Sequence, residues 1–597
     1  MNKSQRILLM AVICISSATN LSAQHFGNQF FLRNMMTPFE WQTDVSFGAI
    51  SWNNSPGKYY LLRNHISLEH SMVTLVTTGK LSALPQSAPT NIQLQQPWGY
   101  RRQRIQIGYR MQTAGLQEAV VRYQPKFKKN PKWGTMNLMV TGGYRNWKNT
   151  HQLDPVNTWS DHYQDAQGTL DFSIDGRKQK FYVNAYLLTG MGRSYNRFIQ
   201  GGIYPENTDD NLLSGNRIQY ERYLSPNVTW TTSLHLNHFS NTSIHEPPIY
   251  RRYELRHLQE SLSSGIRVNR KKMSLTTSLM AQANQDQERS STGFELDQQR
   301  SYAGLYQEWI RYFKTENNNR FLTIQFEHSI LYSTSSTLVR GWRYYPSLHL
   351  SYQRNPFTLT AGAALNEQDV YTNQLYRVVH NPMAGYRIPG VTTESYRSIW
   401  LHGSYQIHSH GSLKFQYNSM EISNRYIYGS PSDRMDLSND QARLTYNFSK
   451  ERLNGELAYT YTTNQNSQQL ELIPENRITL ALSPTRPYYS RYWSYVGNDF
   501  LITPSVNLGY QSGYDLPVLN GERIRTKESM YADAFVRFGL SRGYYYPNRC
   551  SLEVGVTNLF NQVPYDQATD FSEQIAFRNI QGRRFQVGLR FGLGGND

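Results

Sequence analysis

The sequence predicts an all-β protein: a single large antiparallel transmembrane β-barrel of roughly 22 strands, with long extracellular loops and short periplasmic turns. Three observations predict it: an export signal, repeated alternation of apolar and polar residues, and no apolar run beyond the N-terminus near the ~18 residues of a spanning helix. Mean hydropathy is -0.63 and 39% of the residues are apolar, which is too polar for a helical membrane protein. A barrel escapes this limit because only alternate residues of each strand face lipid.

Residues 1–23 have the pattern of a secretory signal peptide. Lys3 and Arg6 supply the positive start, Ile7 to Ile15 form the apolar core, and cleavage after Ala23 fits the small-residue rule. The apolar core is too short to span a bilayer. We therefore expect an exported protein of a Gram-negative outer membrane.

The rest of the chain is interpreted as one domain. Residues 24–39 form a short N-terminal segment without a clear period, and strand-like runs follow from Glu40, so the barrel is predicted over residues 40–597. Of the two cysteines, Cys14 lies in the signal peptide, so the mature chain cannot form an internal disulfide. Cys550 is interpreted as a small apolar residue on a strand.

Period-two alternation recurs along the chain, and the longer runs approach the ~9–11 residues that cross a bilayer at a tilt. The runs are 105–110, 135–140, 228–237, 322–327, 413–418, 453–461 and 530–540. Short turn sequences such as Asp175-Gly176, Arg354-Asn355-Pro356 and His410-Gly411 separate some runs. Long polar loops are predicted at Gly190 to Arg217, Glu367 to Arg397 and Asn464 to Asn498. Short turns at one end and long loops at the other are typical of outer-membrane barrels.

The last fifty residues alternate most regularly. Leu552, Val554 and Val556 share one face of a predicted strand, and Ser551 and Glu553 share the other. The final run repeats this pattern, with its apolar face made by Phe585, Val587, Leu589, Phe591 and Leu593. In a membrane barrel the apolar face meets lipid and the polar face lines the lumen. We predict that orientation here.

This region resembles the C-terminal part of TonB-dependent receptor barrels. The residues that carry the resemblance are 552–561, ending in Asn558-Leu559-Phe560-Asn561, and the last strand, which is led by Gly582-Arg583. Gln581-Gly582 followed by Phe585 and Val587 is also similar to the signal read by the barrel assembly machinery. The resemblance implies uptake or passage of a solute across the outer membrane.

Partners follow from the same resemblance. It implies outer-membrane lipid, the barrel assembly machinery during insertion, and TonB, a separate plug chain or a lipoprotein. No motif of the family's plug domain is recognised, so the sequence does not itself indicate coupling to TonB. Nucleic acid is excluded as a partner, because the net charge of +17 is spread among strands and forms no single patch. The lumen is expected to be occluded by inward loops, because a ring of this size would otherwise leak.

No catalytic, metal or cofactor site is predicted, and the protein is not expected to be an enzyme. His235/His238 and His408/His410 are the closest histidine pairs, but no third ligand lies near either in sequence. No phosphate-binding glycine-rich loop is visible. Outer-membrane lipase activity stays open as a third class, because serines and histidines are present without a local signature.

Substrate-binding residues are not assigned. The basic and aromatic stretch Glu246 to Tyr253 and the tyrosine-rich loop Asn464 to Asn498 could contact a solute or lie at the headgroup layer. The alternative to transport is a non-transporting surface receptor, an adhesin or a structural subunit of an envelope complex.

Overall fold

The structure is a computed structural model that describes residues 105–593 except for connecting segments. Residues 1–104 and 594–597 lie outside the described part. The internal gaps are 114–116, 126, 128–133, 153–157, 198–205, 246–250, 292–294, 315–319, 336–340, 370–392, 409–410, 428–429, 451, 465–474, 485–487, 491–498, 514, 518–522, 526–527, 542–549, 558, 562–564, 572–573 and 580–582.

The described residues form strands and short turns. The first thirteen strands are β1 Ile105–Gln112, β2 Gln117–Tyr123, β3 Thr135–Gln152, β4 Thr158–Asp175, β5 Gln179–Arg197, β6 Glu206–Ser225, β7 Val228–His245, β8 Arg251–Arg270, β9 Met273–Ser290, β10 Glu295–Lys314, β11 Arg320–Ser335, β12 Gly341–Arg354 and β13 Phe357–Asp369. The others are β14 Thr393–His408, β15 Gly411–Ile427, β16 Ser430–Lys450, β17 Leu453–Asn464, β18 Asn476–Pro484, β19 Tyr488–Ser490, β20 Asp499–Gln511, β21 Asp515–Pro517, β22 Arg523–Arg525, β23 Ser529–Ser541, β24 Cys550–Thr557, β25 Tyr565–Phe571, β26 Gln574–Asn579 and β27 Arg584–Leu593.

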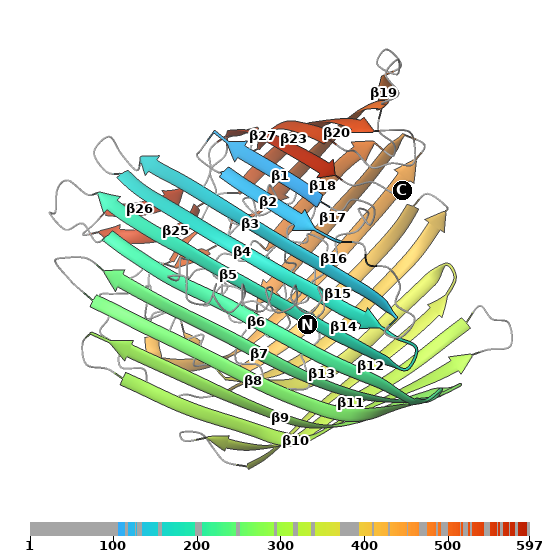
Figure 1. Ribbon diagram of the computed structural model, residues 1–597. Helices are drawn as coiled ribbons and strands as arrows, with labels where there is room; N and C mark the ends of the chain where they lie inside the picture. Colours follow the sequence, from blue (N-terminus) through green and yellow to red (C-terminus); the bar gives the residue numbers. More distant parts are fainter. Residues whose placement is uncertain are drawn as a thin grey trace.

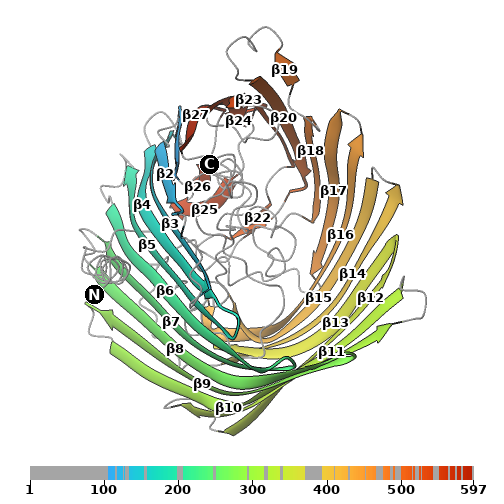
Figure 2. The same ribbon diagram turned by 45° about the vertical axis from the view of Figure 1, so that its right-hand side comes forward.

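The main sheet is antiparallel and returns on itself, as Figures 1 and 2 show. The ring is joined where β27 pairs with β1, from Ile105 opposite Leu593 to Gln112 opposite Gln586. The short strand β19 pairs with β20 beyond β18, with the register moved by two residues, so β18 and β19 share one place in the ring. The described strands therefore fill 22 places, in agreement with the predicted barrel. Closure leaves no edge strand in the sheet.

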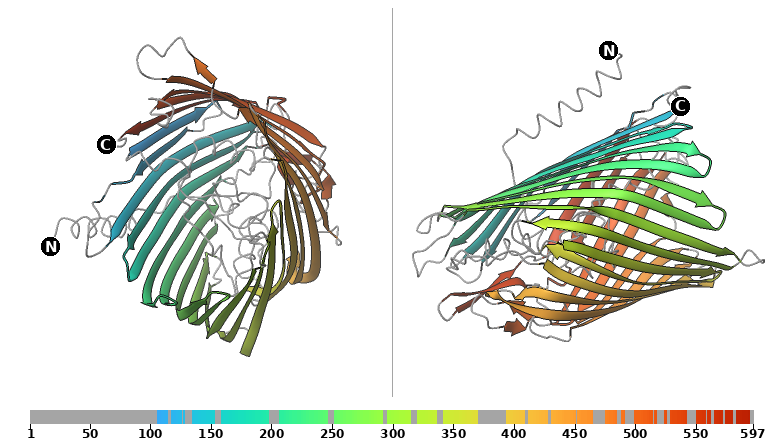
Figure 3. Two further views of the ribbon diagram at one scale, coloured as in Figure 1. Left: turned by 90° about the vertical axis from the view of Figure 1, so that its right-hand side faces the viewer. Right: turned by 90° about the horizontal axis from the view of Figure 1, so that it is seen from below.

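The two ends of the barrel differ. Connections of two or three residues join β4 to β5, β6 to β7, β8 to β9, β12 to β13 and β16 to β17, all at the end that we call the tight-turn end. At the opposite, long-loop end, β13 ends at Asp369 and β14 begins at Thr393, and the strands β20, β23, β24 and β27 are joined there through the two small hairpins. Figure 3 shows the ring from two further directions.

Two small hairpins belong to the connections at the long-loop end. Strands β21 and β22 pair with each other, and so do β25 and β26. The first hairpin contacts the second through β21 and β25. In Figure 2, where β22, β25 and β26 are labelled, both hairpins lie within the outline of the ring.

Two of the predicted loops were wrong in extent. Gly190 to Arg217 was predicted as a loop, yet β5 continues to Arg197 and β6 begins at Glu206. Asn464 to Asn498 contains β18 and β19. Polar residues mislead at β5 and β6 because a strand can stay polar on both faces where it extends beyond the lipid. In β18 the short alternation of Ile478, Leu480 and Leu482 was overlooked within a polar stretch.

Other expectations were confirmed or remain untested. The predicted turns after Asp175 and Arg354 are present, and all the alternating runs from Ile105 onward are strands. The signal peptide, the segment 24–39 and the predicted barrel start at Glu40 lie outside the described residues. Within the described part, no helix is long and apolar enough to cross a membrane.

Candidate functional site: the polar inner wall

Apolar side chains point out of the ring. Leu279 on β9 is 69% exposed and Trp342 on β12 is 71% exposed, whereas Ser329 on β11 is 0% and Gln586 on β27 is 1% exposed. A water-soluble protein shows the reverse distribution. The strongly buried polar side chains of the wall are Ser233, Ser274, Gln282, Ser329, Ser333, Asn418, Gln441, Thr445, Thr462, Asp533, Ser551, Glu553 and Gln586.

The C-terminal strands confirm the predicted orientation residue by residue. Leu552 and Val554 are exposed, while Ser551 and Glu553 between them are buried. Small polar side chains become buried here because the inner side of a curved sheet is concave, so side chains from neighbouring strands converge there. The polar face is therefore the crowded inner wall of the barrel.

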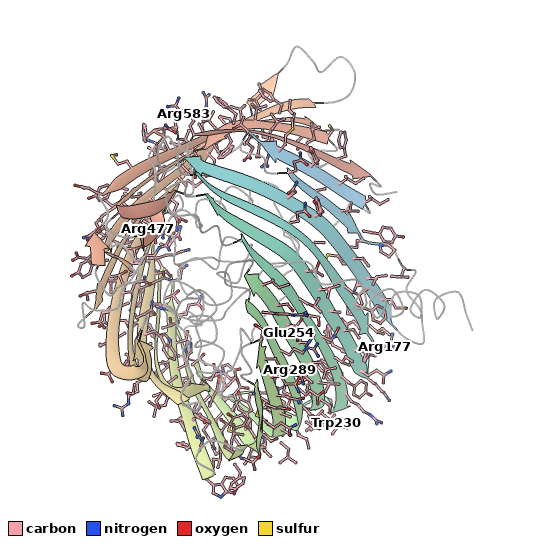
Figure 4. All side chains as sticks on the ribbon, turned by 90° about the vertical axis from the view of Figure 1, so that its left-hand side faces the viewer. Arg177, Trp230, Glu254, Arg289, Arg477 and Arg583 are labelled. Atoms are coloured by element: carbon pink, nitrogen blue, oxygen red, sulfur yellow. The ribbon has the colours of Figure 1, made fainter. Side chains whose placement is uncertain are left out.

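The outward apolar belt has aromatic residues at both edges. Trp230 and Trp309 lie near the tight-turn end, and Tyr332 and Trp342 lie at the long-loop edge with ring centroids 5.3 Å apart. Charged residues replace the belt farther along the strands, where Glu254 lies opposite Arg289. Figure 4 shows these residues: Trp230 lies at one end of the strands, and Glu254 and Arg289 lie toward the other. Such a belt with aromatic girdles matches the lipid-facing surface of a membrane barrel.

An ion pair joins the inner faces of the last strands. Arg537 Nη2 on β23 lies 2.9 Å from Glu553 Oε2 on β24, and Arg537 Nε donates to the same oxygen at 3.3 Å. Gln586 Nε2 on β27 donates to the second oxygen, Glu553 Oε1, at 2.9 Å. Because β27 also pairs with β1, this network lies beside the junction that closes the ring.

Two carboxylates lie side by side on the inner wall in another part of the ring, on β10 and β11. Glu308 on β10 is directly opposite Glu327 on β11. Like charges in this position repel, but Gln325 Nε2 donates to both carboxylates, and Thr276 Oγ1 donates to Glu308 Oε2 at 3.1 Å. Arg267 Nε donates to Thr276 Oγ1 at 3.3 Å and brings a positive charge nearby. These hydrogen bonds and the nearby arginine offset the repulsion between the two carboxylates, so the pair is a structural part of the wall.

A buried indole packs on the inner wall farther round the ring. Trp400 on β14 lies opposite Gly362 on β13, and its ring centroid is 6.2 Å from that of His349 on β12. A Cβ added to Gly362 would be only 2.2 Å from the Trp400 ring. The missing side chain of Gly362 therefore makes the space in which Trp400 packs.

Gly362→Ala is expected to destabilise the barrel by about 1–3 kcal/mol, because the Trp400 ring must move. Urea unfolding followed by tryptophan fluorescence measures this. Gly403→Ala on the neighbouring strand is the control, because its added Cβ would meet its nearest neighbour at an ordinary 3.8 Å. An equal effect of the two substitutions would show that the Trp400 contact has no special role.

A row of polar side chains crosses the next strands. His402 Nε2 and Asn418 Oδ1 lie 3.0 Å apart, and Gln441, directly opposite Asn418, donates from Nε2 to Thr462 Oγ1 at 3.4 Å. Gln441 Oε1 is buried and makes no hydrogen bond in the structure. The row combines donors and acceptors without a charged group, and Asn418, Gln441 and Thr462 are buried, so these contacts join neighbouring strands within the wall.

The two histidine pairs noted in the sequence are only partly placed by the structure. His238 lies on the outward face of β7, and three positions earlier the backbone of His235 pairs with that of Arg217. His408 ends β14, and His410 lies outside the described residues. In the described part of the chain, no three His, Cys, Asp or Glu side chains gather as metal ligands would. The absence of a metal or catalytic site stays a prediction.

Most of the predicted contact stretches cannot be placed. Residues 246–250 and most of 464–498 lie outside the described part, although Arg252 is placed on the outward face of β8, 2.6 Å from Glu254. Sequence reasoning missed the polar rows of the wall. Alternation identifies the inner face of each strand, but the partner across the sheet depends on register, which pairs residues far apart in sequence.

Solved structures share this architecture, although no protein-family model and no curated relative matches the sequence. The FrpB iron transporter from Neisseria meningitidis matches with a TM-score of 0.60 at 9% identity, covering 85% of this chain and 86% of that one. BauA, the ferric preacinetobactin receptor from Acinetobacter baumannii, matches with a TM-score of 0.55 at 10% identity, covering 81% and 79%. The copper transporter OprC matches with a TM-score of 0.57 at 12% identity, covering 82% and 80%.

The chain therefore has the barrel fold of these receptors and transporters over about four-fifths of its length. This confirms, for the fold, the resemblance to TonB-dependent receptor barrels noted at the C-terminus. At identities of 9 to 12%, the likeness concerns the fold alone.

Proposed function

We propose that this protein is an outer-membrane barrel that takes part in the uptake of a solute across the outer membrane. The observation that carries the proposal is the inverted distribution of side chains, with apolar rows outside and polar rows inside. In lipid every backbone polar group must be paired within the protein, and a closed ring of strands meets that requirement. The predicted signal peptide, residues 1–23, supports export to this membrane.

The proposed solute is polar. The inner wall is built of amides, hydroxyls and ion pairs rather than apolar side chains, as the row His402, Asn418, Gln441 and Thr462 illustrates. The similar proteins are named as an iron transporter, a ferric preacinetobactin receptor and a copper transporter, which makes small metal chelates the first class to test. Coupling to TonB is not part of the proposal.

Flux through vesicles tests the proposal. The mature protein is reconstituted in liposomes, and entry of labelled ferric chelates is compared with entry into liposomes without protein. Protein-dependent entry of a chelate is the expected result. Binding of a chelate or of a partner chain without any entry would favour the alternative, a surface receptor or structural subunit. Release of fatty acid from phospholipid in detergent would instead indicate a lipase.

The two inner hairpins are expected to restrict the lumen. They lie within the outline of the ring and contact each other. Replacing residues 515–525 and 565–579 by short flexible linkers is therefore expected to turn a barrel of low conductance into a steadily open pore. Conductance in planar bilayers measures this change.

A matched replacement in the long loop 370–392 serves as the comparison. It removes residues at the same end of the barrel and leaves both hairpins in place. A steady large pore in the unmodified protein would refute occlusion. Equal conductance of the hairpin variant and the unmodified protein would show that these hairpins do not close the lumen.

A further inference from the structure

Exposed cations accumulate at the tight-turn end of the barrel, on the same outward face as the apolar rows. Arg222 follows Ile218 on β6, Arg270 follows Ile266 on β8, and Arg354 follows Leu350 on β12, each four positions farther along the strand. Residues separated by an even number of positions share a face. These cations therefore border the apolar belt.

Two further cations extend the same row. Arg311 on β10 lies between Trp309 and Phe313 on the outward face, with its guanidinium carbon 4.9 Å from the centre of the Phe313 ring. Lys450, at the end of β16, shares the face of Leu444 and Tyr446. We call Arg222, Arg270, Arg311, Arg354 and Lys450 the basic collar. Its members come from five hairpins between β6 and β17.

Among the described residues at this end of the barrel, exposed carboxylates are fewer than exposed cations. Exposed cations also occupy the turns themselves, at Arg177, Lys178, Lys271, Lys272 and Arg452. Among the described residues at these hairpin ends, the carboxylate side chains of Asp175 and Glu456 are exposed, and each has its own cation, Lys180 at 3.4 Å and Arg443 at 3.7 Å. The sequence adds Glu316 and Glu451 to the turns, but also Lys314 and Arg320.

The opposite edge of the belt has a different charge pattern. There Arg252 Nη2 lies 2.6 Å from Glu254 Oε1, and Arg397 Nη1 lies 3.8 Å from Glu421 Oε2. Arg289 is directly opposite Glu254 across β8 and β9. These three cations of the opposite edge have carboxylates beside them, whereas at the collar the exposed cations outnumber the exposed carboxylates among the described residues.

We propose that the basic collar binds the phosphate groups of anionic phospholipids in the membrane leaflet at the tight-turn end. This inference rests on the proposed membrane location. The collar continues directly from the apolar belt, so a lipid whose chains contact the belt has its headgroup at the level of the collar. Arginine and lysine side chains reach along apolar surface and keep their charge at the interface. Each lysine or arginine near an anionic lipid surface strengthens the attraction between the protein and the lipid headgroups.

Spin-labelled lipids test the proposal. The protein is inserted into phosphatidylcholine vesicles that contain a trace of spin-labelled phosphatidylglycerol or spin-labelled phosphatidylcholine, and electron paramagnetic resonance measures the fraction of label immobilised by the protein. We expect about a three- to fivefold preference of the unmodified protein for phosphatidylglycerol. The variant with all five substitutions, R222Q/R270Q/R311Q/R354Q/K450Q, is expected to lose that preference.

Two control variants make the result specific. Replacing the four collar arginines by lysine and Lys450 by arginine keeps the charge, so the preference should remain. Replacing Arg252, Arg289 and Arg397 by glutamine removes cations from the opposite edge and should leave it unchanged. All eight positions lie on the barrel's outer surface, and folding of each variant is checked by its heat-dependent electrophoretic mobility.

Each remaining outcome contradicts one specific claim. Equal immobilisation of the two lipids by the unmodified protein would overturn the collar proposal. A soluble acidic partner would then be the expected ligand of these cations. An unchanged preference for phosphatidylglycerol in the variant with five substitutions would also overturn the collar proposal. Absence of any immobilised lipid would contradict the membrane location itself, and so the proposed function.

Discussion

Val506→Arg is expected to destabilise the folded barrel by about 2–4 kcal/mol in lipid, because the side chain faces outward near the middle of β20. A guanidinium in the hydrocarbon layer loses its hydration and has no partner there. Unfolding in urea from phospholipid vesicles, followed by tryptophan fluorescence, measures the loss. This measurement tests directly which face of the wall meets lipid.

Asn507→Arg is the matched control, since it adds the same charge one residue farther along the strand and on the opposite face. Asn507 lies directly opposite Asp533 on β23, so the new cation gains a neighbouring carboxylate. We expect a change of less than about 1 kcal/mol. A larger loss for Asn507→Arg than for Val506→Arg would reverse the assignment of inside and outside.

Glu553→Ala is expected to cost about 3–5 kcal/mol of stability, because it removes one partner of a largely buried ion pair. The side chains of Arg537 and Glu553 are 21% and 9% exposed, so water compensates little for the lost carboxylate. Gln586 loses the acceptor of its amide at the same time. The midpoint of urea unfolding is expected to fall, and Glu553→Gln should recover part of the loss by keeping hydrogen bonds.

Glu421→Ala removes one carboxylate from an exposed pair and serves for comparison. The side chains of Arg397 and Glu421 are 71% and 60% exposed and lie 3.8 Å apart, so the expected cost is below about 1 kcal/mol. Similar losses for Glu553→Ala and Glu421→Ala would mean that the network beside the ring junction contributes no more than an ordinary surface pair.

Much of the wall was predictable from single strands. The alternation of Leu552, Glu553 and Val554 predicted their exposure correctly, because the direction of a side chain depends only on its position within its own strand. Strand ends were harder to predict. β6 begins with a polar segment at Glu206 and was interpreted as a loop, since beyond the lipid neither face of a strand needs apolar residues.

The candidate site was less predictable than the fold. Nothing in the sequence near Gly362 indicates that Trp400 packs on it, because the two residues meet through the pairing of β13 with β14. The basic collar has the same origin. Arg222, Arg311 and Lys450 are ordinary strand-end cations individually, and they form a row only because their strands end at the same rim of the ring.

The sequence by itself determined that alternate side chains are apolar and that these rows face away from the polar ones. Those features are local, since each follows from the two-residue repeat of an extended chain. Only the tertiary structure decided that β27 returns to β1, that Arg537 meets Glu553 and Gln586, and which cations line one rim. Closure and register depend on hydrogen bonds between distant segments, which the pattern of a single strand does not specify.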